Sequence, residues 1–300
     1  NTTSREERGM KFFITGGGGQ LALAFQRLLK EENLPFAVYS RQELDITDIT
    51  RVRKRMQEEK PDVVINCAAW NDVDSAEQNW RGAYMVNAIG PRNLAIAAEE
   101  LGIPLVTFSS DYVFNGKSVR SWTIADKPDP INVYGQTKLL GEEFVKDHIR
   151  RFLIVRVSWV FGPEGREESN FLKKVLRWSR EKDELKIVSD QISSPTYAPD
   201  LAERVMELLT LRAWGTYHLS CSGRCSRYEW ASFALKEIGW KKNIVQAQSN
   251  EFRTLAQRPA MSSLDSFPLE EFGIFMPRWE DSTLRFLKAI GQKNGGNNNV

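Results

Sequence analysis

Residues 11–22 read KFFITGGGGQLA, and this stretch decides the fold class. Its apolar half predicts a short buried strand, and residues 21–30 predict a helix directly after it. Glycines between a strand and a helix let the backbone turn sharply and approach a diphosphate, whose charge meets the amide groups at the helix N-terminus. The spacing is Gly-x-x-Gly-x-x-Ala, and the small alanine lets helix and strand pack closely. We therefore expect a dinucleotide to contact Gly16, Gly19, Gln20 and Leu21.

Strand and helix patterns alternate after this loop. Helical patterns separate the apolar runs, and a long one at 80–101 breaks near Gly90-Pro91. The apolar runs predict strands at residues 36–39, 62–69, 104–109 and 152–160. This alternation predicts an α/β fold, a Rossmann-type doubly wound parallel sheet with helices on both faces.

The pattern becomes less regular after Gly162-Pro163. Helices are predicted at residues 171–180, 201–211 and 228–238, and a strand at 216–220. We interpret residues 10–165 as a dinucleotide-binding domain. Residues 166–292 are interpreted as mainly a smaller substrate-binding α/β domain, with elements that return to the main sheet. Residues 1–9 and 293–300 are expected to be disordered or vector-derived.

The composition is that of a globular protein, with 300 residues, 41% of them hydrophobic, and a formal net charge of +2. A net charge this close to zero does not indicate a basic surface that would bind nucleic acid or an anionic membrane. No apolar run is long enough to span a bilayer, and no secretory signal is visible. Cys67, Cys221 and Cys225 form no disulfide framework and lack the further partners of a zinc site. We expect a cytoplasmic protein.

Polar residues after the second strand bear on the choice of cofactor. An NAD-preferring site usually has an acid there for the ribose 2′-hydroxyl, whereas this chain has Ser40 and Arg41, which could hold a 2′-phosphate. This favours NADPH, with NADH still possible. Asp45 and Ile46 follow and are expected near the adenine. A solvated surface charge is the alternative for Arg41.

The third and fourth strands end in small residues and hydroxyls. Ala68, Ala69 and Trp70 lie at the end of the third strand, where small residues permit a ribose or nicotinamide to lie close to the backbone. The Ser110 hydroxyl, beside Asp111, could hydrogen-bond a substrate carbonyl oxygen, and local capping is its alternative. Ligands of open parallel sheets bind beyond the carboxyl ends of the strands. These residues are therefore expected in one site.

Tyr134 and Lys138 form a Tyr-x-x-x-Lys pair in a predicted helix. Residues four apart share one helix face, so the phenol and the ammonium can point into one site. A free phenol has a pKa of about 10 and is a poor acid at neutral pH. A nearby cation favours the phenolate and moves that pKa toward the working range. The pair is thus suited to donate a proton to a carbonyl oxygen.

Together these motifs resemble the extended short-chain dehydrogenase/reductase family, and more closely its dTDP-4-dehydrorhamnose reductase members. The resemblance covers roughly residues 10–292 and includes motifs outside the cofactor fold. The motifs are GGGGQLA at 16–22, LDIT at 44–47, NCAAW at 66–70, VDxAE at 73–77, NA at 87–88, SDYVFxG at 110–116, NVYGxTK at 132–138, RVSWV at 156–160, NF at 170–171, DQISSPT at 190–196 and RPAxSxL at 258–264.

The resemblance implies reduction of the C4 ketone of dTDP-6-deoxy-L-lyxo-4-hexulose to dTDP-L-rhamnose, for polysaccharide synthesis. Tyr134 would donate the proton, Lys138 would hold the nicotinamide ribose, and Ser110 would contact the same oxygen. The resemblance also implies a cofactor contact at Asn87 and sugar-nucleotide contacts at Val73, Asp111, Trp159, Asn170 and Arg258. A domain-closing salt bridge is the alternative for Arg258. Trp70 is bulkier than the usual residue, so the exact sugar nucleotide stays open.

Related enzymes with this fold catalyse other reactions, and these need different acidic and basic side chains. A 4,6-dehydratase needs an adjacent Asp-Glu pair, and Tyr112 stands where the second carboxylate would be. A reductase or epimerase of another 4-ketosugar nucleotide stays open, as does a non-catalytic regulatory subunit resembling that of methionine adenosyltransferase. Some family members dimerise through magnesium. We predict no metal ligand here, and we leave both Mg²⁺ and the choice between monomer and homodimer open.

Overall fold

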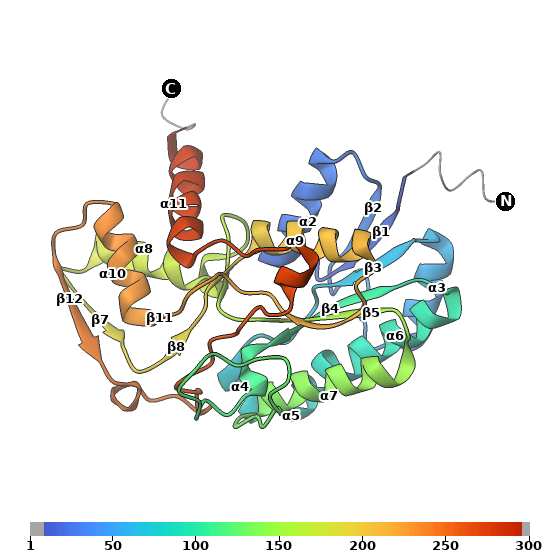
Figure 1. Cartoon of the computed structure of the whole chain (residues 1–300), viewed down its shortest axis with the longest axis horizontal. Coiled ribbons are helices and arrows are strands. Elements are labelled where there is room, and N and C mark those ends of the chain that lie inside the picture. The colour runs from blue at the N-terminus through green and yellow to red at the C-terminus, as the bar shows by residue number, and fades with distance from the viewer. Residues whose placement is uncertain (1–8, 296–300) are drawn as a thin grey trace.

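The computed structural model describes residues 9–295, and a six-stranded parallel sheet forms its centre (Figure 1). The strand order is β10-β5-β4-β3-β1-β2. The strands are β1 (Phe12–Thr15), β2 (Phe36–Tyr39), β3 (Val63–Asn66), β4 (Leu105–Ser110), β5 (Phe152–Val157) and β10 (Gly215–His218). The chain moves outward from β1 to β2 and then continues on the other side of β1. This reversal is the switch point beyond which doubly wound sheets bind ligands, and the predicted fold class is confirmed.

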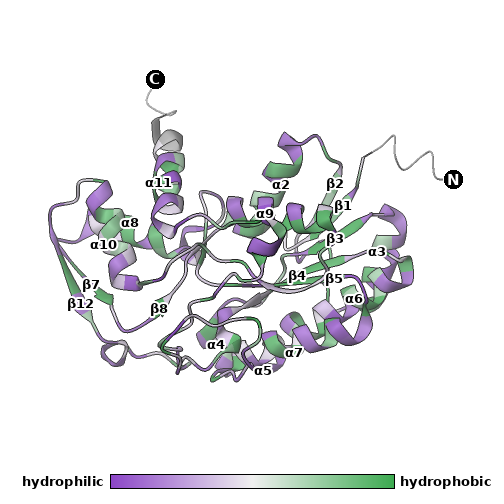
Figure 2. Ribbon diagram, viewed as in Figure 1, coloured by the Kyte–Doolittle hydropathy of each residue, from purple (hydrophilic) through white to green (hydrophobic). Residues whose placement is uncertain are grey.

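Helices cover both faces of the sheet. Helices α2 (Gln20–Glu31) and α9 (Ala198–Leu211) lie on one face and pack against each other. Helices α3 (Ile49–Glu59), α6 (Gly90–Leu101) and α7 (Val133–His148) lie on the other face (Figure 1). Figure 2 shows green, hydrophobic strands inside these layers and purple patches on the helices, as expected for a sheet buried on both sides.

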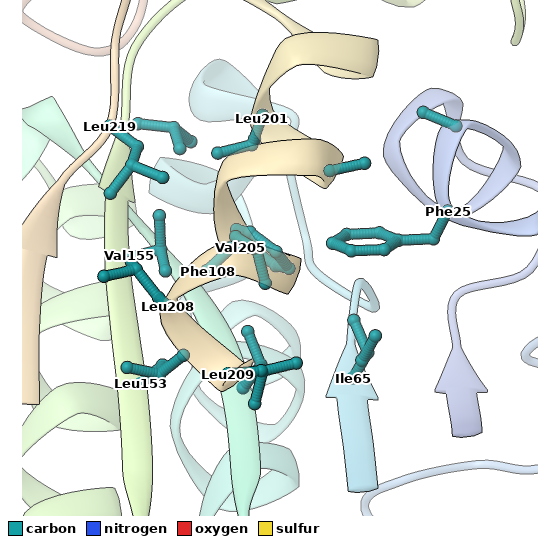
Figure 3. Close-up of a cluster of buried hydrophobic side chains, with 14 of the residues drawn as sticks. Phe25, Ile65, Phe108, Leu153, Val155, Leu201, Val205, Leu208, Leu209 and Leu219 are labelled. Carbon is teal, nitrogen blue, oxygen red and sulfur yellow. The ribbon is translucent and has the colours of Figure 1, made fainter. Parts of the chain in front are cut away.

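The core between α2, α9 and the sheet is built from large apolar side chains. In Figure 3 the Phe25 ring of α2 points toward Phe108 of β4, and the two ring centres lie 5.9 Å apart. Leu201, Val205 and Leu208 extend from α9 over the same strands. Burial of such side chains contributes about 1.5–3 kcal/mol each relative to exposure. This packing fixes α2, and with it the glycine loop, against the sheet.

The long helical pattern of residues 80–101 is divided into three parts. They are α5 (Trp80–Tyr84), a π-helical turn (Met85–Ile89) and α6, which starts at Gly90. A side chain at Gly90 would place its Cβ 2.4 Å from the Ile46 side chain, so glycine is required for this close approach. The chain stays helical through Gly90-Pro91, so the predicted break is wrong; the helix only changes type, at the π-helical turn just before Gly90. The short helix α4 (Val73–Gln78) was not predicted.

Apart from β10 and α9, the described C-terminal residues form three small strand pairs and three helices. The pair β7 with β12 and the pair β6 with β9 are parallel, whereas β8 and β11 are antiparallel. Their bounds are β6 (Val160–Phe161), β7 (Glu184–Val188), β8 (Ile192–Ser193), β9 (Thr196–Tyr197), β11 (Cys225–Ser226) and β12 (Asn243–Ala247). The helices are α8 (Phe171–Glu181), α10 (Arg227–Glu237) and α11 (Trp279–Gly295). Single 3₁₀ turns cover Asp111–Val113, Glu167–Ser169, Ser249–Glu251 and Leu269–Phe272.

Two elements after residue 165 return to the main sheet. Strand β10 pairs with β5 in parallel, and α9 covers the face shared with α2. The remaining elements have separate apolar clusters, one of them around Phe161 and Trp230. Division into domains at residue 165 stays a prediction. Within residues 9–295 no helix combines the length and the apolar character that a bilayer crossing requires.

Candidate active site

A cleft of about 670 Å³ lies at the carboxyl ends of the central strands and extends to the C-terminal elements. The glycine loop contributes Gly19, Gln20 and Leu21 to its lining. The other predicted residues that line it come from the ends of β3, β4 and β5, from α7 and from the C-terminal part: Ala69, Ser110, Asp111, Tyr134, Lys138, Trp159 and Arg258. The predicted cofactor loop and the predicted proton donor therefore share one cavity.

The glycine loop has the close packing that a diphosphate cradle needs. Gly16 has a φ of +73°, and a Cβ there would lie 2.6 Å from the Ala68 backbone nitrogen. The amide of Gly19 donates to the Gly16 carbonyl oxygen at 2.9 Å, which closes the turn. A Cβ at Gly18 would meet no atom within 4 Å, so the loop is open on that side. These features fit a nicotinamide dinucleotide whose diphosphate lies at the N-terminus of α2.

The end of β2 carries an acid that the sequence reasoning did not weigh. Ser40 Oγ donates to Glu43 Oε2 at 2.7 Å, and the Ser40 amide donates to the same oxygen at 2.8 Å. Arg41 is exposed. Asp45 accepts hydrogen bonds from the Thr47 amide and hydroxyl, and Ile46 is buried. The serine predicted for a 2′-phosphate is thus engaged by a carboxylate three residues later.

Asn87 lies behind the end of β3 and supports the residues there. Its Oδ1 accepts from the Trp70 amide at 2.8 Å, and its Nδ2 donates to the Trp70 carbonyl oxygen at 3.1 Å and to Thr137 Oγ1 at 3.1 Å. The Trp70 indole donates to Ser75 Oγ at 3.0 Å. The buried amide therefore links the β3 end to α7. Direct contacts of Asn87, Trp70 and Ala68 with a cofactor stay predictions.

The helix that carries the Tyr/Lys pair is tied to the end of β4. Asn132 caps α7, because its Oδ1 accepts from the Gly135 amide at 2.8 Å. A Cβ at Gly135 would lie 2.1 Å from the Tyr112 carbonyl oxygen, so only glycine allows this approach. The rings of Tyr112 and Tyr134 meet edge to face at 5.9 Å. This contact orients the Tyr134 ring at the wall of the cleft.

Tyr134 and Lys138 are both buried at the base of the cleft. Lys138 Nζ donates to the Phe108 carbonyl oxygen at 2.6 Å. Burial lowers the pKa of Lys138 to about 8, and the nearby Glu142 carboxylate opposes this change. Burial raises the pKa of Tyr134, while hydrogen bonding by Ser110 acts in the opposite direction. At neutral pH the phenol is protonated and the amine charged, as a proton donor with a cationic neighbour requires.

Ser110 and Asp111 form a small polar group at the end of β4. Ser110 Oγ donates to Asp111 Oδ1 at 3.0 Å and accepts from the Tyr112 amide at 3.1 Å. Asp111 Oδ2 accepts from Ser193 Oγ at 3.2 Å. Burial raises the pKa of Asp111 to about 6, against the effect of these hydrogen bonds. The Ser110 hydroxyl thus caps the following turn and also lines the cleft.

The remaining predicted substrate residues lie in different surroundings. Asn170 is fully buried and caps α8, with its Oδ1 accepting from the Lys173 amide and its Nδ2 donating to the Gly162 carbonyl oxygen. Val73 packs in the same apolar cluster as Tyr134. Arg258 forms two hydrogen bonds with Asp74, at 2.7 and 2.6 Å. The salt-bridge alternative for Arg258 is present in the structure, and the substrate contacts of all three stay predictions.

Three cationic residues in the cleft were missed by the sequence reasoning. They are Lys174 of α8, Lys186 of β7 and Arg227 of α10. No local motif marks them, because they come from three elements that meet only in the folded chain. Among the described residues, no three His, Cys, Asp or Glu side chains are placed to hold a metal ion. Magnesium stays an open question.

Comparison with known proteins places the chain among relatives of the predicted kind. Residues 10–291 match the family described as RmlD substrate binding domain. The chain belongs to this family. Its match covers both the glycine loop and the C-terminal elements, so the predicted resemblance is confirmed.

Individual relatives agree with this assignment. The Bacillus subtilis spore coat polysaccharide biosynthesis protein SpsK is 38% identical, covering 93% of this chain and 97% of that protein. The dTDP-4-dehydrorhamnose reductase of Sinorhizobium fredii is 36% identical, covering 94% and 98%. The crystal structure of dTDP-4-dehydrorhamnose reductase from Bacillus anthracis, in complex with NADP, superposes with a TM-score of 0.90 at 38% identity and covers 93% of this chain and 99% of that one.

Proposed function

We propose that this chain is an NADPH-dependent oxidoreductase that reduces dTDP-6-deoxy-L-lyxo-4-hexulose to dTDP-L-rhamnose. One observation carries the proposal: the glycine loop and the buried Tyr134/Lys138 pair line the same cleft. Membership of the RmlD family and relatives named dTDP-4-dehydrorhamnose reductase supply the substrate class. The bound NADP of the Bacillus anthracis structure supports the cofactor.

The cofactor would be held by residues on two sides of the switch point. Gly16, Gly19 and Gln20 would hold the diphosphate, and Lys138 the nicotinamide ribose. Ser40 and Arg41 would meet the 2′-phosphate. When bound there, a reduced nicotinamide supplies the hydride that the C4 carbon of the sugar accepts.

Tyr134 would transfer its phenolic proton to the C4 oxygen as the ketone becomes an alcohol. The reaction leaves a phenolate, and the ammonium of Lys138 would stabilise that charge at close range. The Ser110 hydroxyl would donate a hydrogen bond to the same oxygen. Positioned proton transfer of this kind contributes about 10²–10⁴-fold to the rate.

The test is a direct assay with purified protein, dTDP-6-deoxy-L-lyxo-4-hexulose and either NADPH or NADH. We expect loss of the reduced-nicotinamide absorbance with NADPH, and a product identified as dTDP-L-rhamnose by NMR. Tyr134→Phe should lose about 10²-fold or more in kcat with little change in cofactor affinity, since only the proton donor is removed. Absence of turnover with this and other 4-ketosugar nucleotides, together with tight binding to a partner protein, would favour the non-catalytic alternative.

A further inference from the structure

The cations that line the cleft differ in whether they have a partner. Lys138 donates to a backbone carbonyl, Lys186 pairs with Glu251, and Arg258 pairs with Asp74. Among residues 9–291, whose side chains the structure describes, those of Arg227 and Lys174 make neither a hydrogen bond nor an ion pair. Both line the cleft. A charged side chain held in a cleft without an acidic partner is suited to meet an anionic ligand.

Arg227 is held in place by aromatic rings. Its guanidinium carbon lies 3.7 Å from the centre of the Trp159 ring and 4.7 Å from that of Phe171. Trp230 stacks nearly parallel to Trp159, with ring centres 5.9 Å apart. A stacked guanidinium keeps its N–H donors in its own plane, where they can engage planar oxygen acceptors. The aromatic contacts therefore fix the group and leave its donors free.

The start of α10 fixes the backbone of Arg227. Ser226 and Glu229 form a capping box, with the Glu229 amide donating to Ser226 Oγ and Glu229 Oε2 accepting from the Ser226 amide at 2.7 Å. The Glu229 carboxylate is thus occupied by the cap. Burial lowers the pKa of Arg227 to about 10, and Asp111 and Tyr112 oppose this change. The guanidinium stays charged at neutral pH and lies near the Ser110 end of the site.

Lys174 adds a second charge to the same wall. It follows Phe171 by three residues on α8, so both side chains project from one face of that helix. Phe171 contacts Arg227 and also lines the cleft. A dianionic group beside the sugar site would therefore meet two positive charges from two helices. Arg258 is less available for this role, because Asp74 binds both of its terminal nitrogens.

We infer that Arg227, stacked on Trp159 and assisted by Lys174, binds the diphosphate of the nucleoside diphosphate sugar and so selects substrates that carry one. The inference rests on the proposed function for the identity of the sugar nucleotide. The diphosphate of the cofactor is the other source of the same chemistry, and it is expected at the glycine loop on the opposite side of the Tyr134 site. Binding experiments can separate the two sources without any turnover.

The experiment compares Arg227→Gln, Arg227→Lys and Lys174→Gln with the unmodified chain. Lys236→Gln is the matched control, since it removes one exposed charge from the same helix α10. Calorimetry measures the affinity for dTDP and for NADPH, and ligand-observed NMR measures the affinity for thymidine. We expect Arg227→Gln to weaken dTDP binding about 10-fold or more, the usual loss for a charge-assisted hydrogen bond. Thymidine and NADPH should bind as before, and Arg227→Lys should recover part of the loss.

Three other results would overturn the inference. Equal losses for dTDP and thymidine would show that Arg227 only supports the packing of Trp159. A loss confined to NADPH would assign Arg227 to the cofactor diphosphate. Unchanged dTDP affinity in Arg227→Gln would exclude the contact. A chain that binds dTDP through Arg227 but turns over no 4-ketosugar nucleotide would reject the proposed function and leave this inference standing.

Discussion

The carboxylate of Glu142 and the guanidinium of Arg156 form two hydrogen bonds, of 2.8 and 2.7 Å, and both side chains are buried. Glu142 follows Lys138 by one turn on α7, and Lys138 follows Tyr134 by one turn. Burial would raise the pKa of Glu142, but the hydrogen bonds of Arg156 outweigh it and lower that pKa. The proton donor, its cation and a buried carboxylate therefore stand in one row on a single helix.

Breaking this ion pair should destabilise the fold. Glu142→Gln leaves the Arg156 charge buried without its counter-ion, and such changes cost about 3–5 kcal/mol. Chemical denaturation at neutral pH should show this loss as a lower midpoint. The double variant Glu142→Gln with Arg156→Met removes both charges and should recover much of the stability. A single variant as stable as the unmodified chain would show that the pair contributes little.

The rate of hydride transfer should fall in mild alkali. Burial lowers the pKa of Lys138 to about 8, so its ammonium is present below that pH and is lost as the pH rises through it. Because the pKa of Tyr134 is raised, the phenol keeps its proton over this range. We expect kcat/KM to decline above a pH of about 8. A profile that stays level well beyond that pH would show that the charge of Lys138 is not needed.

Rising pH should change the stability of the fold through Lys138 in the opposite direction from its effect on activity. Its pKa is lower in the folded chain than in the unfolded one, so the unfolded chain binds more protons between the two values. The contribution of Lys138 to stability should therefore rise with pH above about 8, while activity declines. Comparing the unfolding free energy of the unmodified chain and Lys138→Met across this range measures the effect. The two curves should converge as the pH rises, because the neutral amine no longer incurs the cost of burying a charge.

Glu43 should limit the preference for NADPH. Its carboxylate accepts from the Ser40 hydroxyl at 2.7 Å, at the strand end where a 2′-phosphate is expected. Two charges about 4 Å apart in water repel by about 1 kcal/mol, which corresponds to about fivefold. We expect Glu43→Gln to raise the ratio of kcat/KM with NADPH to kcat/KM with NADH by about that factor. Glu58→Gln, an exposed acid on α3, should leave the ratio unchanged.

Asp74 should hold the segment that carries Arg258 against α4. Its Oδ1 accepts from the Leu255 and Ala256 amides at 2.8 and 2.9 Å, in addition to the contact with Arg258. Asp74→Asn should free this segment, which would raise KM for the sugar nucleotide more than it lowers kcat. Faster cleavage in limited proteolysis should accompany the change. Glu31→Gln, which breaks an exposed pair with Arg27, serves as the control and should change neither measurement.

The sequence by itself determined the features that local spacing controls. The apolar run before Gly16 predicted β1, and the glycine spacing predicted the turn into α2, because both depend on residues adjacent in the chain. The Tyr134/Lys138 pair could be placed on one face for the same reason, since the period of a helix is known in advance. Motifs of this kind were also sufficient to indicate the family.

Only the tertiary structure decided which remote residues share the cleft. Arg258 and Asp74 are 184 positions apart, and nothing near either residue indicates their ion pair. Arg227 and Lys174 reach the site because α8 and α10 pack together, and β7, which pairs with β12, adds Lys186 to the lining. Such contacts depend on how apolar faces of distant segments fit, which no local spacing encodes. The folded chain therefore showed that Arg227 and Lys174 line the cleft. The sequence had already indicated proton donation by the Tyr134/Lys138 pair.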